Sequence, residues 1–239
     1  MAWIKYPKLD TLWMRRETRP KGLIVPGEYA NPVFPNIRNW RVTEKVDGTN
    51  IRVIYKQQPT HGTPVRTVTI TGRTDDAQIP VPLLNYLKDT FTDELMLDNF
   101  GRDDSPPHMV MLCGEGYGNK INKAGKRYRD DVSFILFDVY IDGWWLTMPN
   151  VRDVAGKLGV DVVPDLGMMT IDEIVEFIQG EPVSRISGIV DPTLSMEGIV
   201  AEAEPMLYTR NPDNPSPVKF KLKCRDYRQL EAKKHLIEE

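Results

Sequence analysis

TEKVDGTN, residues 43–50, joins two segments that both have the character of β-strands. Gly48 predicts a tight turn, because glycine adopts backbone conformations that other residues avoid. The second segment, residues 51–56, alternates between two faces, as a half-buried strand does. We therefore expect a β-hairpin in which Lys45 lies where the first strand gives way to the turn.

Lys45 is followed two residues later by the carboxylate of Asp47 and is surrounded by hydrogen-bonding side chains. A lysine amine becomes a nucleophile only when it is deprotonated, through partial burial or a neighbouring cation. A bare Lys-x-Asp-Gly is also typical of a surface hairpin with a solvated lysine, and such short patterns recur by chance. The octapeptide alone leaves both interpretations open.

The composition is that of an ordinary globular protein. Of the 239 residues, 41% are hydrophobic and 27% are charged, which suits one large or two small domains. The chain has no apolar run long enough for a membrane helix and no signal-peptide layout, so we expect a cytoplasmic protein without a membrane partner. Cys113 and Cys224 form no metal-binding pattern and are expected to be reduced thiols.

The formal net charge of −3 excludes a protein that is basic overall, but the basic residues are unevenly placed. Residues 119–129 carry five basic side chains and no acid, and residues 219–234 carry seven against two acids. A local basic surface can bind phosphates despite a negative total charge. A solvated charged face explains each run equally well when it is considered alone.

Further segments predict strands and helices. Residues 110–113 form a short apolar strand that runs into the glycine-rich residues 114–118, typical of a backbone that closes on a ligand or of a plain turn. Residues 134–141 predict a buried central strand, in which the acid Asp138 needs partners. We expect helices within residues 80–97, from an Asn150 cap to about Leu158, and after a capping box at Thr170 and Glu173.

The clearest alternation lies at residues 218–224, where Lys219, Lys221 and Lys223 point one way and apolar side chains the other. An edge strand protected by lysines would give the same pattern. Upstream, Glu197 directly precedes a glycine in a predicted strand at residues 196–201.

In order and spacing, these segments resemble the motifs of the covalent nucleotidyltransferases, which include ATP-dependent DNA and RNA ligases and mRNA capping enzymes. TEKVDGTN resembles motif I, whose lysine attacks the α-phosphate of a nucleotide, so the resemblance makes Lys45 the nucleophile. The segments that resemble the later motifs are residues 71–74 (motif Ia), 114–115 (the ribose-binding glutamate), 134–138 (motif III), 197–200 (motif IV) and 221–223 (motif V, with Lys219 as an alternative start).

Within this superfamily, residues 6–227 resemble the phage-type RNA ligases of the RNA ligase 2-like group. Thr49-Asn50, the Gly-Arg-Thr at residues 72–74 and the Glu-Gly-Tyr-Gly-x-Lys at residues 115–120 carry this likeness. It implies the α+β nucleotidyltransferase fold of ligase adenylation domains, which is ATP-grasp-like, with antiparallel sheets flanked by helices. We expect one such domain over residues 1–239, with an N-terminal arm (1–40), a short helical C-terminal tail (225–239) and no OB-fold.

The resemblance also implies ligands and roles. Lys45, Lys221 and Lys223 would carry catalysis, while Glu197 and Asp47 would bind Mg²⁺ or Mn²⁺. Phe137 would stack on adenine, and Glu115 would accept a hydrogen bond from a ribose hydroxyl. The full set expected to bind ATP is Glu44, Lys45, Asp47, Asn50, Arg73, Glu115, Phe137, Glu197, Lys221 and Lys223.

The implied reaction joins a 5′-phosphate to a 3′-hydroxyl through lysyl-AMP, on RNA or an RNA-containing nicked duplex, as in RNA repair. We expect a monomer, and the phage-type likeness is compatible with a phage-encoded protein in a host cytoplasm. The alternatives are a minimal ATP-dependent DNA ligase, an mRNA capping guanylyltransferase and a non-catalytic nucleic-acid-binding relative. An OB-fold is expected for the first two, and decay in the third should have removed charged motif residues, which are present here.

Overall fold

The computed structural model describes residues 5–58, 60–61, 63–74, 77–102, 105–186, 188–210 and 215–233. The chain forms two compact units, each assembled from separate stretches of sequence. Unit 1 comprises Met1–Tyr6, Asp47–Val163 and Gly188–Asp191, and unit 2 comprises Pro7–Val46, Pro164–Ser187 and Pro192–Glu239. The chain therefore passes from unit 2 to unit 1 inside TEKVDGTN, between Val46 and Asp47.

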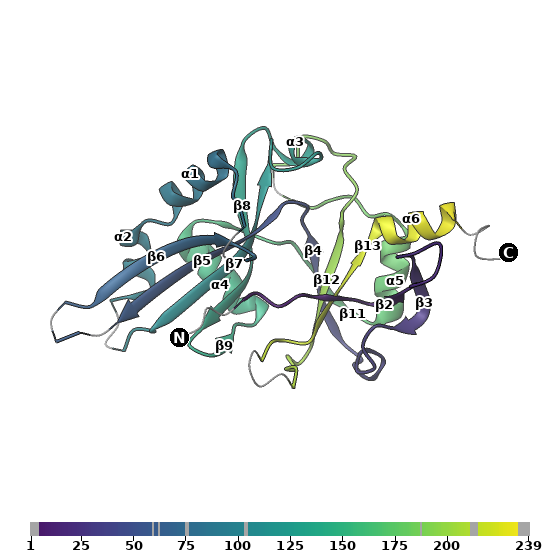
Figure 1. Ribbon diagram of the computed structural model, residues 1–239, viewed down its shortest axis with the longest axis horizontal. Coiled ribbons are helices and arrows are strands. Elements are labelled where there is room, and N and C mark those ends of the chain that lie inside the picture. The colour runs from purple at the N-terminus through teal and green to yellow at the C-terminus, as the bar shows by residue number, and fades with distance from the viewer. Residues whose placement is uncertain are drawn as a thin grey trace. The chain divides into compact units, whose positions relative to one another are not determined.

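Unit 2 contains a five-stranded sheet with the strand order β1-β13-β12-β4-β11 (Figure 1). All neighbours in it are antiparallel except β1 and β13. The strands of this sheet are β1 (Asp10–Thr11), β4 (Trp40–Lys45), β11 (Asp165–Met169), β12 (Gly198–Ala203) and β13 (Lys219–Lys223). The rest of unit 2 is the ribbon of β2 (Trp13–Arg15) and β3 (Ile24–Tyr29), the short η1 (Phe34–Asn36), α5 (Ile171–Gln179) and α6 (Cys224–Ala232).

One face of this sheet is hydrophobic and the other is charged. Trp40, Ile199 and Phe220, on three adjacent strands, are fully buried in one core cluster with Ile174 and Ile178 of α5. Because side chains alternate along a strand, the residues between them face the other way. The predicted capping box of α5 is confirmed: the backbone N–H of Thr170 donates to Glu173 at 2.7 Å, and the Thr170 hydroxyl accepts from the Glu173 N–H.

Unit 1 contains a second sheet with the order β10-β8-β7-β5-β6, with β9 beside β8. Its strands are β5 (Thr49–Gln58), β6 (Val65–Gly72), β7 (Met109–Gly118), β8 (Val132–Ile141), β9 (Trp144–Trp145) and β10 (Asp161–Val162). Its helices are α1 (Val81–Thr90), α2 (Asp93–Phe100), α3 (Gly125–Tyr128) and α4 (Met148–Leu158). Both units thus consist mainly of antiparallel sheets with few helices, and the antiparallel sheets implied by the resemblance are confirmed.

The predicted hairpin around Gly48 is wrong. The two strands that flank the turn belong to different sheets: β4 pairs with β11 and β12, whereas β5 pairs with β6 and β7. Glycine is still required at position 48, because a Cβ atom there would lie 2.2 Å from the carbonyl oxygen of Gly116 in β7. The pattern of TEKVDGTN predicted a strand, a turn and a strand, but it held no information on strand partners.

The glycine-rich residues 114–118 are neither a loop nor a turn, because they lie within β7. A Cβ atom on Gly114 would lie 2.2 Å from the Phe134 ring, and one on Gly116 would lie 2.3 Å from Leu83. The two glycines therefore let β8 and α1 side chains pack directly against the strand. This packing explains both glycines, and closure of the strand on a ligand stays a prediction.

Several smaller predictions can also be checked. The apolar β8 is largely buried, and its Asp138 accepts a hydrogen bond of 2.7 Å from the Tyr6 hydroxyl. Residues 80–97 hold α1 and the first part of α2, and α4 begins at Met148 after Thr147, so Asn150 lies inside the helix rather than at its cap. Both cysteines are buried and free. No helix within the described ranges is long and apolar enough to span a membrane.

Candidate active site

Lys45 and Lys223 are brought together by strand pairing in unit 2. Lys45 ends β4 and Lys223 ends β13, and both lie opposite Gly198, the first residue of the intervening β12. Opposed residues share a face of a sheet, so both lysines project from the charged face. The register of three strands therefore unites residues from distant parts of the chain.

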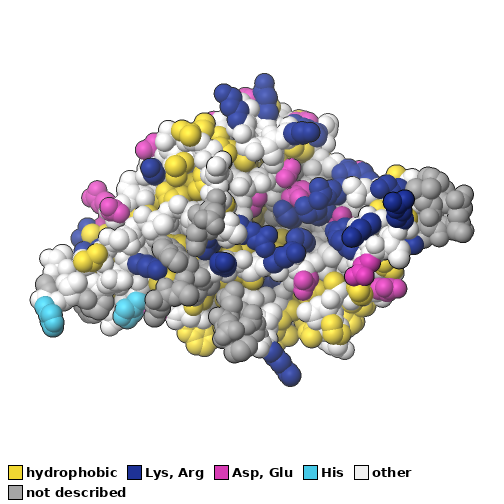
Figure 2. All heavy atoms as spheres, in the orientation of Figure 1, with side chains coloured by type: hydrophobic (Ala, Val, Ile, Leu, Met, Phe, Trp, Pro, Cys, Tyr) yellow, Lys and Arg dark blue, Asp and Glu magenta, His cyan; other side chains and the backbone are white. Residues whose placement is uncertain are grey.

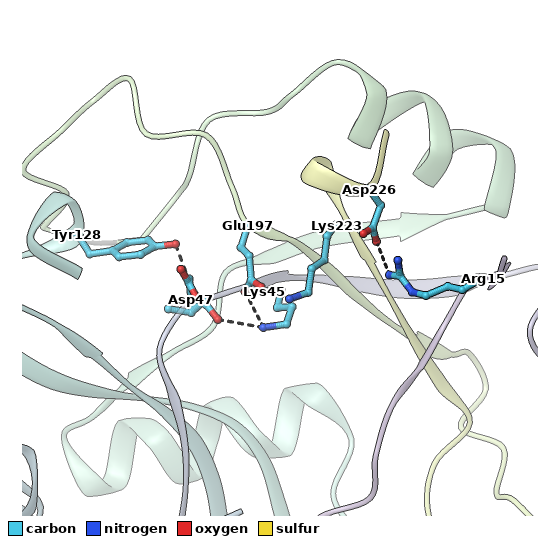
Figure 3. Close-up of polar contacts among 8 residues, drawn as sticks. Arg15, Lys45, Asp47, Tyr128, Glu197, Lys223 and Asp226 are labelled. Atoms are coloured by element: carbon cyan, nitrogen blue, oxygen red, sulfur yellow. Dashed lines mark hydrogen bonds and ion pairs between the residues drawn. The ribbon is translucent and has the colours of Figure 1, made fainter. Parts of the chain in front are cut away.

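Glu197 lies between these lysines and binds both of them (Figure 3). Lys45 Nζ is 2.6 Å from Oε2 of Glu197, and Lys223 Nζ forms an ion pair with Oε1. The side chains of Lys45, Lys223 and Glu197 are 22%, 16% and 12% exposed, so this Lys45–Glu197–Lys223 cluster is shielded but reachable. Two ammonium groups and one carboxylate leave a positive charge, which suits a polyphosphate.

Gly198 explains why Glu197 is followed by a glycine. A Cβ atom at this position would lie 2.1 Å from the carbonyl oxygen of Leu222 and 2.7 Å from Cα of Lys223. Any side chain would therefore push β13 away from β12. The glycine allows the close approach of strands that sets the spacing of the cluster.

The alternating lysine row of β13 is confirmed, since Phe220 and Leu222 are fully buried while the lysines between them are partly exposed. Lys219 is bound to Glu202 at 2.6 Å, and its side chain is only 7% exposed. Lys221 lies on the same face, between Lys219 and Lys223. The edge-strand interpretation is wrong, because β13 pairs with β12 on one side and with β1 on the other.

The structure does not bring Glu44 to the Lys45–Glu197–Lys223 cluster. Glu44 precedes Lys45 in β4 and therefore faces the opposite side of the sheet. Its buried carboxylate accepts hydrogen bonds from the Ser184 hydroxyl and, at 2.7 Å, from the backbone N–H of Arg185. Burial raises the pKa of Glu44, and the Ser184 hydrogen bond opposes this shift. The carboxylate thus holds residues 184–186 against β4.

Unit 1 carries the residues predicted to recognise the nucleoside. Asn50 on β5 lies opposite Glu115 on β7, so both share a face of the second sheet. Phe137, on the neighbouring β8, lies at a bulge, and its half-buried ring packs edge-on against Tyr6 at 5.2 Å between centroids. Within the described part of the chain, Oδ1 of Asn50 is buried without a hydrogen-bond partner. Such an oxygen is costly to leave unpaired, which suits a group that awaits a donor.

Asp47 and Arg73 are also in unit 1. The backbone N–H of Asp47 donates to the Tyr128 hydroxyl at 3.5 Å, and Arg73 is exposed just beyond β6. No group of three or more His, Cys, Asp or Glu residues that could hold a metal ion occurs among the residues that the structure describes. Glu197 and Asp47 as metal ligands therefore stay a prediction.

Three side chains that the sequence did not single out contact predicted site residues. Tyr6 packs on Phe137, Tyr128 contacts Asp47, and Ser184 binds Glu44. Each contact joins residues far apart in the chain, and none belongs to a short pattern. The only signal in the sequence was the demand of a buried acid for partners, noted for Asp138.

Comparison with known proteins gives one family and one fold. The model of the family described as RNA ligase matches residues 38–221. An RNA ligase from Naegleria gruberi, solved with pyrophosphate, aligns with a TM-score of 0.57 and 16% identity over 98% of this chain and 61% of that chain. A glutamate-to-alanine mutant of that ligase, solved with ATP and Mn, aligns with a TM-score of 0.56 and 16% identity over 92% of this chain and 61% of that chain.

The chain therefore spans about three fifths of the length of these solved ligases. A search of curated proteins gives no match. At this identity the structural similarity shows a shared fold, and the family match covers most of the chain.

Proposed function

Because the chain belongs to the RNA ligase family, we propose that it is an ATP-dependent RNA ligase. It joins a 5′-phosphate to a 3′-hydroxyl through AMP held covalently on a lysine. The observation that carries this proposal is the Lys45–Glu197–Lys223 cluster, built where three adjacent strands begin or end. The Naegleria gruberi ligase structures that hold ATP or AMP with Mn support the choice of nucleotide and of a divalent metal.

In the first step, the Lys45 ammonium group releases a proton to water, and the free amine at Nζ attacks the α-phosphate of ATP. A phosphorus–nitrogen bond forms, the bond to the bridging oxygen breaks, and pyrophosphate leaves with the electron pair. Lys221 and Lys223 offset the negative charge on the phosphates, which is the main task of a protein in phosphoryl transfer. A bound Mg²⁺ or Mn²⁺, with Glu197 and Asp47 as its proposed ligands, would neutralise further charge there.

The residues of unit 1 recognise the nucleoside. Phe137 stacks on the adenine, Glu115 accepts a hydrogen bond from a ribose hydroxyl, and Arg73 contacts the nucleotide. The unpaired Oδ1 of Asn50 supports a role for this residue, because a ligand donor would satisfy it. Glu44 acts indirectly, by fixing residues 184–186 against the strand that carries Lys45.

In the second step AMP passes from Lys45 to the 5′-phosphate of a nucleic acid, and in the third step a 3′-hydroxyl displaces AMP. The proposed substrate is RNA or an RNA-containing nicked duplex. We propose that both units together form one nucleotidyltransferase domain that acts as a monomer. The phage-type group and a role in RNA repair rest on sequence motifs alone.

The test is incubation with α-labelled ATP or GTP and Mg²⁺, followed by denaturing electrophoresis. ATP should label the protein through a bond that is stable to alkali and labile to acid, and Lys45→Ala should abolish labelling. Lys157→Ala is the control, because Lys157 is exposed and forms an ion pair with Asp153 of its own helix. Labelling of a folded Lys45→Ala variant would show that Lys45 is not the nucleophile. Labelling by GTP but not by ATP would favour a capping guanylyltransferase. No labelling by either nucleotide would favour a non-catalytic relative.

The substrate is tested on one nick whose 3′-hydroxyl strand is either RNA or DNA. An RNA ligase should seal the nick with the RNA strand faster. Equal or faster sealing of the all-DNA nick would replace this proposal with a minimal DNA ligase.

A further inference from the structure

The connection between β7 and β8 forms a basic surface on unit 1. It begins at Gly118, passes through Lys120 and Lys123, and includes the short helix α3 with Lys126. Gly118 and Lys120 both have positive φ angles, of 108° and 65°, so the chain turns sharply where it leaves β7. The backbone N–H of Asn119 donates to the carbonyl of Asp131 at 2.9 Å, which closes the connection at its base.

The five basic residues of this connection differ in how their charge is compensated. Arg127 pairs with Asp191 at 2.8 Å, and Arg129 pairs with Asp131 and lies over the Tyr117 ring at 5.7 Å. In contrast, three lysines are exposed and form no ion pair with any residue that the structure describes. These residues, called the α3 lysines below, are Lys120, Lys123 and Lys126. Figure 2 shows basic side chains that project over α3, at the top of the view.

The backbone that carries these lysines is anchored to the rest of unit 1. Tyr128 is buried and packs edge-on against Tyr117, with ring centroids 6.0 Å apart. The backbone N–H groups of Val190 and Asp191 donate to the carbonyls of Tyr128 and Arg127. The Tyr128 hydroxyl also accepts the N–H of Asp47, two residues beyond the proposed nucleophile in the chain. The surface is therefore fixed beside the turn that follows Lys45.

We infer that the α3 lysines bind the phosphate backbone of the RNA strand to be sealed. The inference rests on the proposed function, which supplies the nucleic acid. Lysine contacts phosphates as a point charge, and lysine is depleted at protein–protein interfaces, so a polyanion suits this surface better than a protein. The aromatic rings of Tyr117 and Tyr128 are buried and unavailable for stacking on bases. Binding here is therefore independent of sequence, because phosphate contacts carry no base information.

The test compares two triple variants that each remove three positive charges from unit 1. The first is Lys120→Asn, Lys123→Gln and Lys126→Gln, with asparagine chosen because it tolerates the positive φ of Lys120. The matched control is Lys88→Gln, Arg102→Gln and Lys157→Gln, three exposed residues in or next to α1, α2 and α4. The affinity for a 5′-phosphorylated RNA is measured at several salt concentrations, together with sealing and labelling by ATP.

Loss of three phosphate contacts should weaken RNA binding about tenfold or more at low salt. The slope of the logarithm of the binding constant against the logarithm of the salt concentration should become less steep by about 2. Sealing should fall in parallel, while labelling by ATP stays within about twofold of wild type and the control triple keeps wild-type affinity. An unchanged affinity or salt slope, or an equal loss in the control triple, would overturn the inference. If the wild type binds RNA but is never labelled by ATP, the proposed function fails instead.

Discussion

Lys45 Nζ lies 2.6 Å from one carboxylate oxygen of Glu197, and the other oxygen of the same carboxylate binds Lys223. A single acid thus holds the ends of β4 and β13 to a common point on the charged face of the sheet. It also balances part of the charge of two ammonium groups that are largely shielded from water. This arrangement makes Glu197 the most informative residue to change.

Glu197→Gln should lower the rate of labelling by ATP more than about tenfold, because it removes the charge that orients both lysines but keeps the shape of the side chain. The thermal midpoint should change little, since the side chains of both lysines remain partly exposed. The measurement is single-turnover labelling alongside a thermal melt. Glu94→Gln, on the exposed face of α2, is the control. Wild-type labelling by folded Glu197→Gln would exclude a role for this charge.

The three lysines of β13 should differ in whether their substitution affects ligation or stability. Lys221→Ala and Lys223→Ala should each lower ligation more than about tenfold and leave a folded protein, because each removes one charge from the proposed phosphate site. Lys219→Ala should instead destabilise the protein by about 3 kcal/mol, because it breaks the ion pair of the nearly buried Glu202 carboxylate. Ligation assays and urea unfolding give the two readouts.

Neutralising both partners checks the assignment of Lys219. The double variant Lys219→Met with Glu202→Gln should recover much of the lost stability, because the Glu202 charge is removed together with that of Lys219. If Lys219→Ala stays fully stable but loses ligation, Lys219 rather than Lys221 begins the phosphate-binding motif.

Gly198→Ala should damage activity and stability together. The added methyl group would meet the backbone of β13 at Leu222, so the strands must separate, at a cost of about 1–3 kcal/mol. Labelling by ATP should fall because Lys45 and Lys223 no longer meet at Glu197. Gly156→Ala in α4, where a Cβ atom has no neighbour within 4 Å, should be neutral or slightly stabilising. Equal behaviour of the two variants in urea unfolding would contradict the close-approach explanation.

Glu44 should make stability depend on pH. Burial raises its pKa above the ordinary value of 4.5, so the unfolded chain releases this proton at a lower pH than the folded protein does. Its contribution to stability is therefore full below pH 4.5 and is lost as the pH rises through the folded-state pKa. Glu44→Gln cannot titrate at this position. The difference between its unfolding free energy and that of the wild type should therefore shift in favour of the variant as the pH rises from 4.5 through the folded-state pKa. Parallel profiles in urea unfolding would contradict this.

Sequence patterns correctly predicted the parts of the fold that depend on interactions between residues close together in the chain. The capping box at Thr170 and Glu173 and the alternation along β13 follow from nearest neighbours and from burial of one face. Strand partners are a different matter, since nothing within TEKVDGTN indicates that β4 and β5 join separate sheets. The glycines of β7 wrongly suggested a turn, because the contacts that require them, with Phe134 and Leu83, are made by residues elsewhere in the chain.

The candidate site shows the same division. Lys45, Glu197 and Lys223 were identified together by resemblance to known motifs, because no local interaction links residues on three strands. Their ion pairs and the bond of Lys219 to Glu202 required the strand register. The inward orientation of Glu44 follows from strand alternation, but only once the boundaries of β4 and its buried face are known.

The register around Gly198 also limits how this sheet can change over evolutionary time. A shift of β13 by two residues would keep its lysines on the charged face and bring Lys221 opposite Gly198 in place of Lys223. A shift by one residue, such as a single deletion in the loop before β13 could cause, would turn Lys219, Lys221 and Lys223 into the hydrophobic core and expose Phe220 and Leu222. Insertions and deletions near this strand should therefore be tolerated in pairs of residues far more readily than singly.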